Sequence, residues 1–222
     1  METRLSRALR ARDYFAVRIR SARPDDAWDE ALFFFDTALL NLSGALDAAA
    51  RFLHVTFSLS DDTRSAGFAR KSWCASLGTA APHLADLTDL TSSRLSGCAR
   101  SVGVLRNYVH GEDFSQEHHE DGSGLMTVDY GKGALIVPKA DVERLLDATR
   151  LLGDPETFGL ERSSVGSPLL ALPATFLMHI VPAALQALGE LTTAPTYGCR
   201  SRLRWRGPTG YPTLVVSTSC DC

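Results

Sequence analysis

The residues whose types and spacing best suit chemistry lie in one short segment, residues 105–111, with the sequence LRNYVHG. Arg106 and His110 stand four positions apart, so on a helix both side chains would project from the same side. An imidazole can take a proton from a ribose 2′-hydroxyl or give one to a leaving oxygen near neutral pH. A guanidinium stays charged and can stabilise the charge that develops on phosphate oxygens. With Asn107 to orient the phosphate or hold the helix end, the segment predicts metal-independent phosphodiester chemistry.

These residues resemble the arginine-asparagine…histidine signature of the HEPN superfamily. The resemblance implies a compact helical bundle, often dimeric, from toxin–antitoxin or antiviral defence systems. It implies a metal-independent endoribonuclease with Arg106 and His110 as catalytic residues, Asn107 in support and no cofactor. Its partners would be RNA, a cognate antitoxin and a second copy of the chain, because the paired motifs meet across a dimer interface. Arg106 and His110 stand one residue closer than is most common in the family, which turns the histidine by roughly 100° around a helix.

A structural role for the same residues is the alternative. Arg106 could pair with a carboxylate of the first long helix, Asp36 or Asp47, and tie two helices together. Asn107 and His110 could cap the C-terminus of their helix, where histidine is common. The sequence therefore predicts either an active ribonuclease or a non-catalytic helical interaction protein with the motif in a structural role.

Histidines and carboxylates gather in a second segment just after the motif, where they could hold a metal ion. The group consists of Glu112, Asp113, His118, His119 and Glu120. Its spacing matches no recognised ligand pattern, so we expect solvated loop side chains and no metal. A metal-dependent hydrolase that uses this group is the third function class.

Arginines near both ends of the chain could grip RNA. The C-terminal group surrounds Trp205, and guanidinium groups beside an aromatic ring suit a single strand; the alternative is an exposed strand face or a flexible basic tail. The N-terminal group could instead form a solvated helix face. The two groups are Arg200, Arg202, Arg204 and Arg206, and Arg4, Arg7, Arg10 and Arg12.

The composition limits the class of protein. The chain has 222 residues, 45% of them hydrophobic, and a net charge of −3, which fits a globular protein and argues against a general nucleic-acid binder. Its five cysteines are scattered, and residues 1–23 lack the apolar core of a signal peptide, so we expect a cytoplasmic protein. The apolar stretch at 169–188 contains Pro173, His179 and Pro182, which favours a buried helix over a membrane span.

The fold class predicted from these patterns is mainly α: a helical bundle with a small β-hairpin insertion and a poorly defined C-terminal tail. We expect a basic N-terminal arm at 1–23, a HEPN-like domain at 24–191, and a tail at 192–222 that forms an edge hairpin or is poorly ordered.

The first long helix starts after Pro24, is capped by Asp25 or Asp26, and is either continuous or broken near Ser43-Gly44. The hairpin should pair residues 125–130 with 134–137. His54 and His179 are expected to be hydrogen-bonded core residues. Further helices are expected at about 63–77, 92–109, 141–152 and 173–191.

Overall fold

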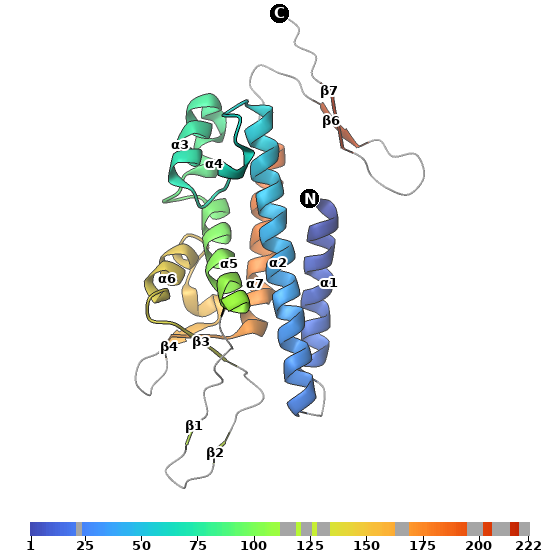
Figure 1. Cartoon of the computed structure of the whole chain (residues 1–222), viewed down its shortest axis with the longest axis vertical. Coiled ribbons are helices and arrows are strands. Elements are labelled where there is room, and N and C mark those ends of the chain that lie inside the picture. The colour runs from blue at the N-terminus through green and yellow to red at the C-terminus, as the bar shows by residue number, and fades with distance from the viewer. Residues whose placement is uncertain are drawn as a thin grey trace, which may run out of the picture.

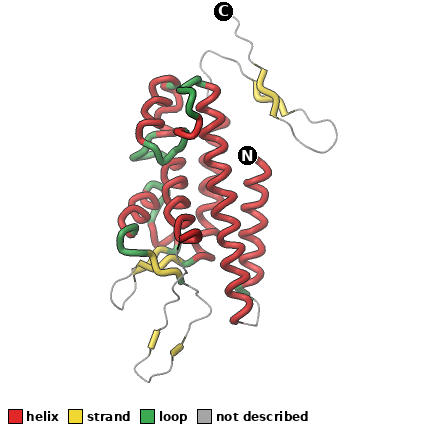
Figure 2. The backbone as a smooth tube through the Cα atoms, in the orientation of Figure 1, coloured by secondary structure: helices red, strands yellow, loops and turns green. Residues whose placement is uncertain are grey.

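A bundle of four long helices forms the body of the protein in the computed structural model (Figure 1). The structure describes residues 1–20, 24–111, 119–120, 126–127, 134–162, 169–194, 202–205 and 214–217. Helices dominate these residues, and the strands are short (Figure 2). The predicted mainly α fold class is confirmed.

The longest helix, α2 (Pro24–Thr56), is continuous through Gly44, so the unbroken form of the predicted helix is confirmed. One side of it carries the apolar residues that recur at helical spacing. They are fully or almost fully buried in the core: Phe35, Leu39, Leu42, Leu46 and Leu53.

Helix α1 (Glu2–Arg18) packs antiparallel along α2, with most of its arginines outside and its small residues inside. Ala8, Ala11 and Phe15 belong to the same core as α2, and Arg18 near the end of α1 pairs with Glu30 near the start of α2. The N-terminal segment is therefore part of the bundle, which differs from the separate arm expected at residues 1–23. The buried side of this helix consists of two alanines and one phenylalanine, which is a weak apolar pattern among so many arginines.

Helices α5 (Arg94–Gly111) and α7 (Pro173–Thr193) complete the bundle. Figure 1 shows α5, α2 and α1 side by side, with α7 behind α2. The predicted apolar stripe of α5 is buried, including Leu95, Cys98 and Leu105. Ser93 precedes the helix, and its hydroxyl accepts a hydrogen bond from the Ser96 amide at 3.1 Å, which caps the N-terminus.

Short elements cover the end of the bundle where α2 stops. They are a 3₁₀ turn (Thr63–Ser65), α3 (Lys71–Ala80), a second 3₁₀ turn (Pro82–Leu84) and α4 (Ala85–Thr88). The helix predicted from residue 63 thus begins later. Asp62 caps only a single turn through the Arg64 amide, and buried Phe68 then leads the chain into the core.

A three-stranded antiparallel sheet lies at the other end, in the order β3 (Leu135–Val137), β5 (Leu169–Ala171), β4 (Leu160–Arg162). The predicted pairing of residues 125–130 with 134–137 is wrong. β3 pairs with β5, and β2 (Met126–Thr127) pairs with β1 (His119–Glu120). The apolar residues of β3 indicate a strand but do not identify its partner. That partner, β5, lies far along the chain and has only three residues, which is too short to show an alternating pattern.

Helix α6 (Val142–Arg150) and a 3₁₀ turn (Pro155–Phe158) lie between β3 and β4. The predicted helix at 141–152 is confirmed, and Gly153 follows it with a φ of 152°, which favours glycine. In the C-terminal tail, β6 (Arg202–Trp205) pairs antiparallel with β7 (Leu214–Ser217), which is the hairpin alternative for this segment.

Two described helices are long and apolar enough to cross a membrane by length and composition alone. They are residues Glu30–Thr56 of α2 and the whole of α7, with mean hydropathies of 1.2 and 1.3. Their apolar windows are 50% and 39% buried within the bundle. The predicted helix at 173–191 is confirmed as α7, and the absence of a membrane contact stays a prediction.

Candidate functional site between helices α2 and α5

Arg106 lies near the end of α5 and reaches across to α2. Its Nη1 donates a hydrogen bond to the hydroxyl oxygen of Ser43 at 2.9 Å, and its Nε is buried without a hydrogen-bond partner among the described residues. The residue as a whole is half-buried. The guanidinium is thus held in place by a neutral group and not by a carboxylate.

The expected ion pair of Arg106 with Asp36 or Asp47 is therefore wrong for the described part of the chain. Asp47 is exposed. Asp36 is seven residues before Ser43, two turns and about 10 Å along the helix axis, which is too far for a guanidinium bonded to Ser43 to reach easily. Arg106 still ties the two helices together, but it does so through a hydroxyl.

Asn107 is exposed at the surface of α5. His110 lies within the same helix, which extends to Gly111, so the predicted helical placement of the motif is confirmed. The side chain of His110 lies outside the part of the chain that the structure describes.

The same side of α2 carries a second titratable group, the carboxyl of Asp36, which the sequence suggested only as an ion-pair partner for Arg106. It lies on the side of α2 that also carries Ser43, since seven residues make nearly two whole turns. Its Oδ1 is buried without a hydrogen-bond partner among the described residues, and burial raises the pKa of this carboxyl from 3.8 to about 6. In the sequence, Asp36 stands within the apolar run LFFFDTALL at 32–40, and a carboxylate in such a run was the signal of a partly buried charge.

The chemical capacity of this site follows from its charges. Ser43 fixes the Arg106 side chain without neutralising it, so the positive charge remains available to an anion. A guanidinium held in this way suits a phosphate group. Asn107, the next residue of α5, supplies an exposed amide, and a histidine at position 110 would supply the proton-transfer group.

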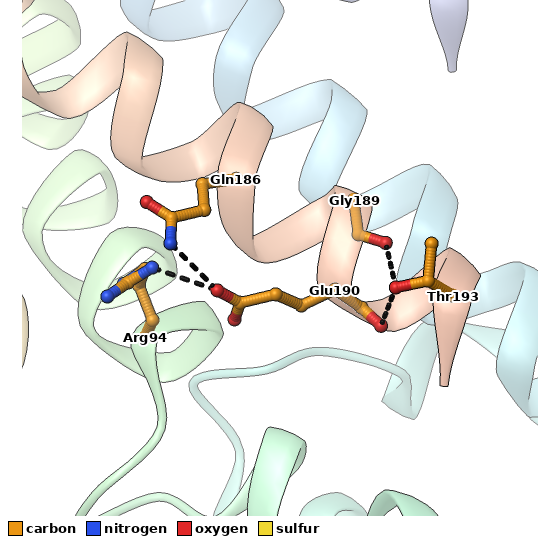
Figure 3. Close-up of polar contacts among 5 residues, drawn as sticks. All are labelled: Arg94, Gln186, Gly189, Glu190 and Thr193. Atoms are coloured by element: carbon orange, nitrogen blue, oxygen red, sulfur yellow. Dashed lines mark hydrogen bonds and ion pairs between the residues drawn. The ribbon is translucent and has the colours of Figure 1, made fainter. Parts of the chain in front are cut away.

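A second polar site lies between α5 and α7, where Arg94 and Gln186 both donate to Glu190 (Figure 3). The distances to Glu190 Oε1 are 3.0 Å from Arg94 Nη1 and 2.9 Å from Gln186 Nε2. A hollow of about 240 Å³ adjoins it, also lined by Asp86 and Ser92. Since Glu190 neutralises Arg94, these three side chains are best explained as a structural contact that holds α5 and α7 together.

The other candidate ligands give no metal centre within the described residues, which contain no group of three or more histidine, cysteine, aspartate or glutamate side chains placed for a metal. Glu112, Asp113 and His118 lie outside the described residues, and so do three of the five cysteines, Cys199, Cys220 and Cys222. Cys74 and Cys98 are free and buried, and burial raises their thiol pKa values to about 11 and about 12.

The two histidines expected in the core differ in their surroundings. His54 is buried: its Nδ1 accepts a hydrogen bond from the Trp73 indole at 3.1 Å, so its Nε2 donates to the Ser60 carbonyl at 2.8 Å. That prediction is confirmed. The prediction for His179 is wrong, because this side chain is exposed on α7, where it contacts the ring of Phe158.

Compared with protein-family models, with curated proteins and with solved structures, the chain matches none of them.

Proposed function

We propose that this chain is a HEPN-like protein that acts on RNA as a metal-independent endoribonuclease. The observation that carries the proposal is the state of Arg106, whose charge is positioned by Ser43 and neutralised by no carboxylate among the described residues. A purely structural arginine between two helices would more often pair with an acid. Asp47, four residues after Ser43 on α2, could have been that partner, but its side chain is exposed.

The proposed reaction starts with the ribose 2′-oxygen, which attacks the phosphorus as His110 takes up its proton. Arg106 stabilises the negative charge that develops on the phosphate oxygens, and Asn107 orients the phosphate. The bond to the 5′-oxygen then breaks, and His110 gives its proton to this oxygen as it leaves. The products are a 2′,3′-cyclic phosphate and a 5′-hydroxyl, and no metal or oxidant is consumed.

The test is cleavage of a fluorogenic RNA by purified protein in excess chelator. Arg106→Ala and His110→Ala should each lower the rate by about 100-fold or more, because each removes a group that acts in the transition state. Arg100→Ala is the matched control: this arginine is on the same helix and its Nη1 donates to the Leu90 carbonyl at 3.5 Å. It should keep nearly the full rate.

Thermal unfolding of the same variants separates catalysis from folding. Near-wild-type melting temperatures with lost cleavage support the nuclease. Wild-type protein that leaves RNA intact, together with variants that unfold at markedly lower temperature, would contradict it.

A non-catalytic interaction protein is the second candidate, favoured by the Arg106–Ser43 hydrogen bond that joins α5 to α2. Under this alternative Ser43→Ala and Arg106→Ala should destabilise the fold by similar amounts, about 1 kcal/mol, and change nothing else.

A cytoplasmic homodimer paired with an antitoxin completes the proposal. Solution mass should then be twice that of the chain. Expression should be toxic unless Arg106 or His110 is replaced.

A further inference from the structure

The outer surface where α1 meets α2 combines guanidinium groups with exposed aromatic rings. Arg7, Arg10 and Tyr14 are exposed and recur at positions i, i+3 and i+7, so they share one side of α1. We call this surface the α1–α2 seam. It consists of Arg4, Arg7, Arg10 and Tyr14 of α1 with Phe33 and Phe34 of α2.

The aromatic rings of the seam form a connected group with free faces. Tyr14 stacks on Phe34 with a centroid distance of 5.2 Å and an interplanar angle of 25°, and Phe33 meets Phe34 edge-on at 5.5 Å. Tyr14 is 56% exposed and Phe33 is 64% exposed. Large aromatic side chains so open to solvent offer platforms on which the flat face of a base can stack.

The charge of the seam is positive in a chain that is negative overall. Helix α1 carries five arginines against two acids, while the whole chain has a net charge of −3. Two neighbouring acids are already paired, Asp13 with Arg12 and Glu30 with Arg18. Arg7 and Arg10 have no ion pair or hydrogen bond from their side chains to any described residue.

Arg4 connects the seam to the candidate site. A Cβ atom on Gly44 would lie 1.6 Å from Arg4 Nη1, so this guanidinium lies directly against the backbone of α2. The residue before Gly44 is Ser43, whose hydroxyl accepts a hydrogen bond from Arg106 Nη1. Two guanidinium groups, one from α1 and one from α5, therefore lie against consecutive residues of the same turn of α2.

We infer that the α1–α2 seam binds a single strand of RNA and leads it to Arg106. Arg4, Arg7 and Arg10 hold phosphates, and Tyr14 and Phe33 stack with bases. The inference rests on the proposed action on RNA and adds the surface that binds the substrate. A strand bound along the seam reaches Arg106 at the turn of α2 that contains Ser43 and Gly44, against which Arg4 lies.

Binding is measured by fluorescence anisotropy with a short, labelled 2′-O-methyl oligouridine, which lacks the 2′-hydroxyl and cannot be cut by this chemistry. Replacing Arg7 and Arg10 together by glutamine should weaken binding about tenfold. It should also lower the slope of log affinity against log salt by about 0.7 for each arginine removed. Arg150→Gln is the matched control, an exposed arginine on α6 that should leave affinity and slope unchanged.

Phe33 distinguishes stacking from apolar docking. Phe33→Tyr keeps an aromatic face and should bind as wild type does, whereas Phe33→Leu keeps apolar bulk without a ring and should lose about tenfold in affinity. Wild-type affinity in Phe33→Leu, or in the Arg7 and Arg10 variant, would overturn the inference. So would a change of solution mass in these variants, which would show that a second copy of the chain covers the seam.

This test is independent of the one for catalysis, because the probe is not a substrate. Loss of cleavage in Arg106→Ala, combined with unchanged probe binding in all seam variants, would contradict RNA binding at the seam and support the nuclease. Probe binding that depends on the seam, in a protein that cuts no RNA, would support RNA binding at the seam and contradict the nuclease.

Discussion

Arg106 and Asp36 each carry a buried polar atom without a hydrogen-bond partner among the described residues, Nε in one case and Oδ1 in the other. Such atoms cost free energy, since water that once bonded to them is lost on folding. Asp36 lies about two turns of α2 from Ser43, to which Arg106 is bonded, so the two atoms do not bond to each other. Most buried polar atoms in proteins are hydrogen-bonded, so these two exceptions distinguish this part of the bundle.

The carboxyl of Asp36 should make stability depend on pH. Its pKa rises from 3.8 to about 6 on folding because of burial, so the folded state binds the proton more tightly. Stability should therefore fall as pH rises from about 4 to about 6. Asp36→Asn should be more stable than wild type at pH 7 by on the order of 1 kcal/mol, a value discounted for partial solvent exposure, and equal to it at pH 4.

Denaturant unfolding at the two pH values checks this prediction. Asp47→Asn is the control on the same helix, because that carboxyl is exposed, and it should change stability little at either pH. A less stable Asp36→Asn protein at pH 7 would mean that the ionised carboxylate has a favourable partner, and the expected pH dependence would then be wrong.

At the scale of elements, the contact between α5 and α6 depends on the absence of a side chain at Gly97. A Cβ atom there would lie 3.0 Å from the Ala148 carbonyl oxygen and 2.8 Å from Leu152 Cδ2. The helices could not keep their present separation. Gly97→Ala should therefore destabilise the protein by about 1–3 kcal/mol, as overpacking usually does.

Gly103, on the same helix, provides the opposite case. A Cβ atom there would meet nothing within 4 Å. Gly103→Ala should raise stability by up to about 1 kcal/mol, because alanine loses less backbone entropy in a helix. Chemical denaturation of both variants measures the difference, and two variants of equal stability would contradict the close approach of α5 to α6.

At the scale of the whole molecule, periodicity predicted the elements that bury a long apolar stripe. The helices α2, α5, α6 and α7 were predicted for this reason, and so was the burial of His54. Helix α1 was missed as part of the bundle because its buried side is narrow and mostly alanine. Sheet pairing was wrong because three-residue strands carry too little pattern to specify a partner.

The candidate site was predictable in part. Residue types and spacing indicated Arg106, Asn107 and His110, and the structure places all three positions on one helix. Ser43 as the partner of Arg106 was not predictable, because the contact depends on the register of α5 against α2, which no local pattern records. The same holds for Arg4, which meets Gly44 only because α1 lies antiparallel to α2.

The measurement that tests the central claim most directly is the mass of RNA fragments cut by the purified protein in excess chelator. Wild-type protein should give fragments with 2′,3′-cyclic phosphate and 5′-hydroxyl ends, and Arg106→Ala should give almost none. Intact RNA with both proteins, the same fragments with both, or ends that carry a 3′-hydroxyl and a 5′-phosphate would contradict a phosphodiester chemistry centred on Arg106.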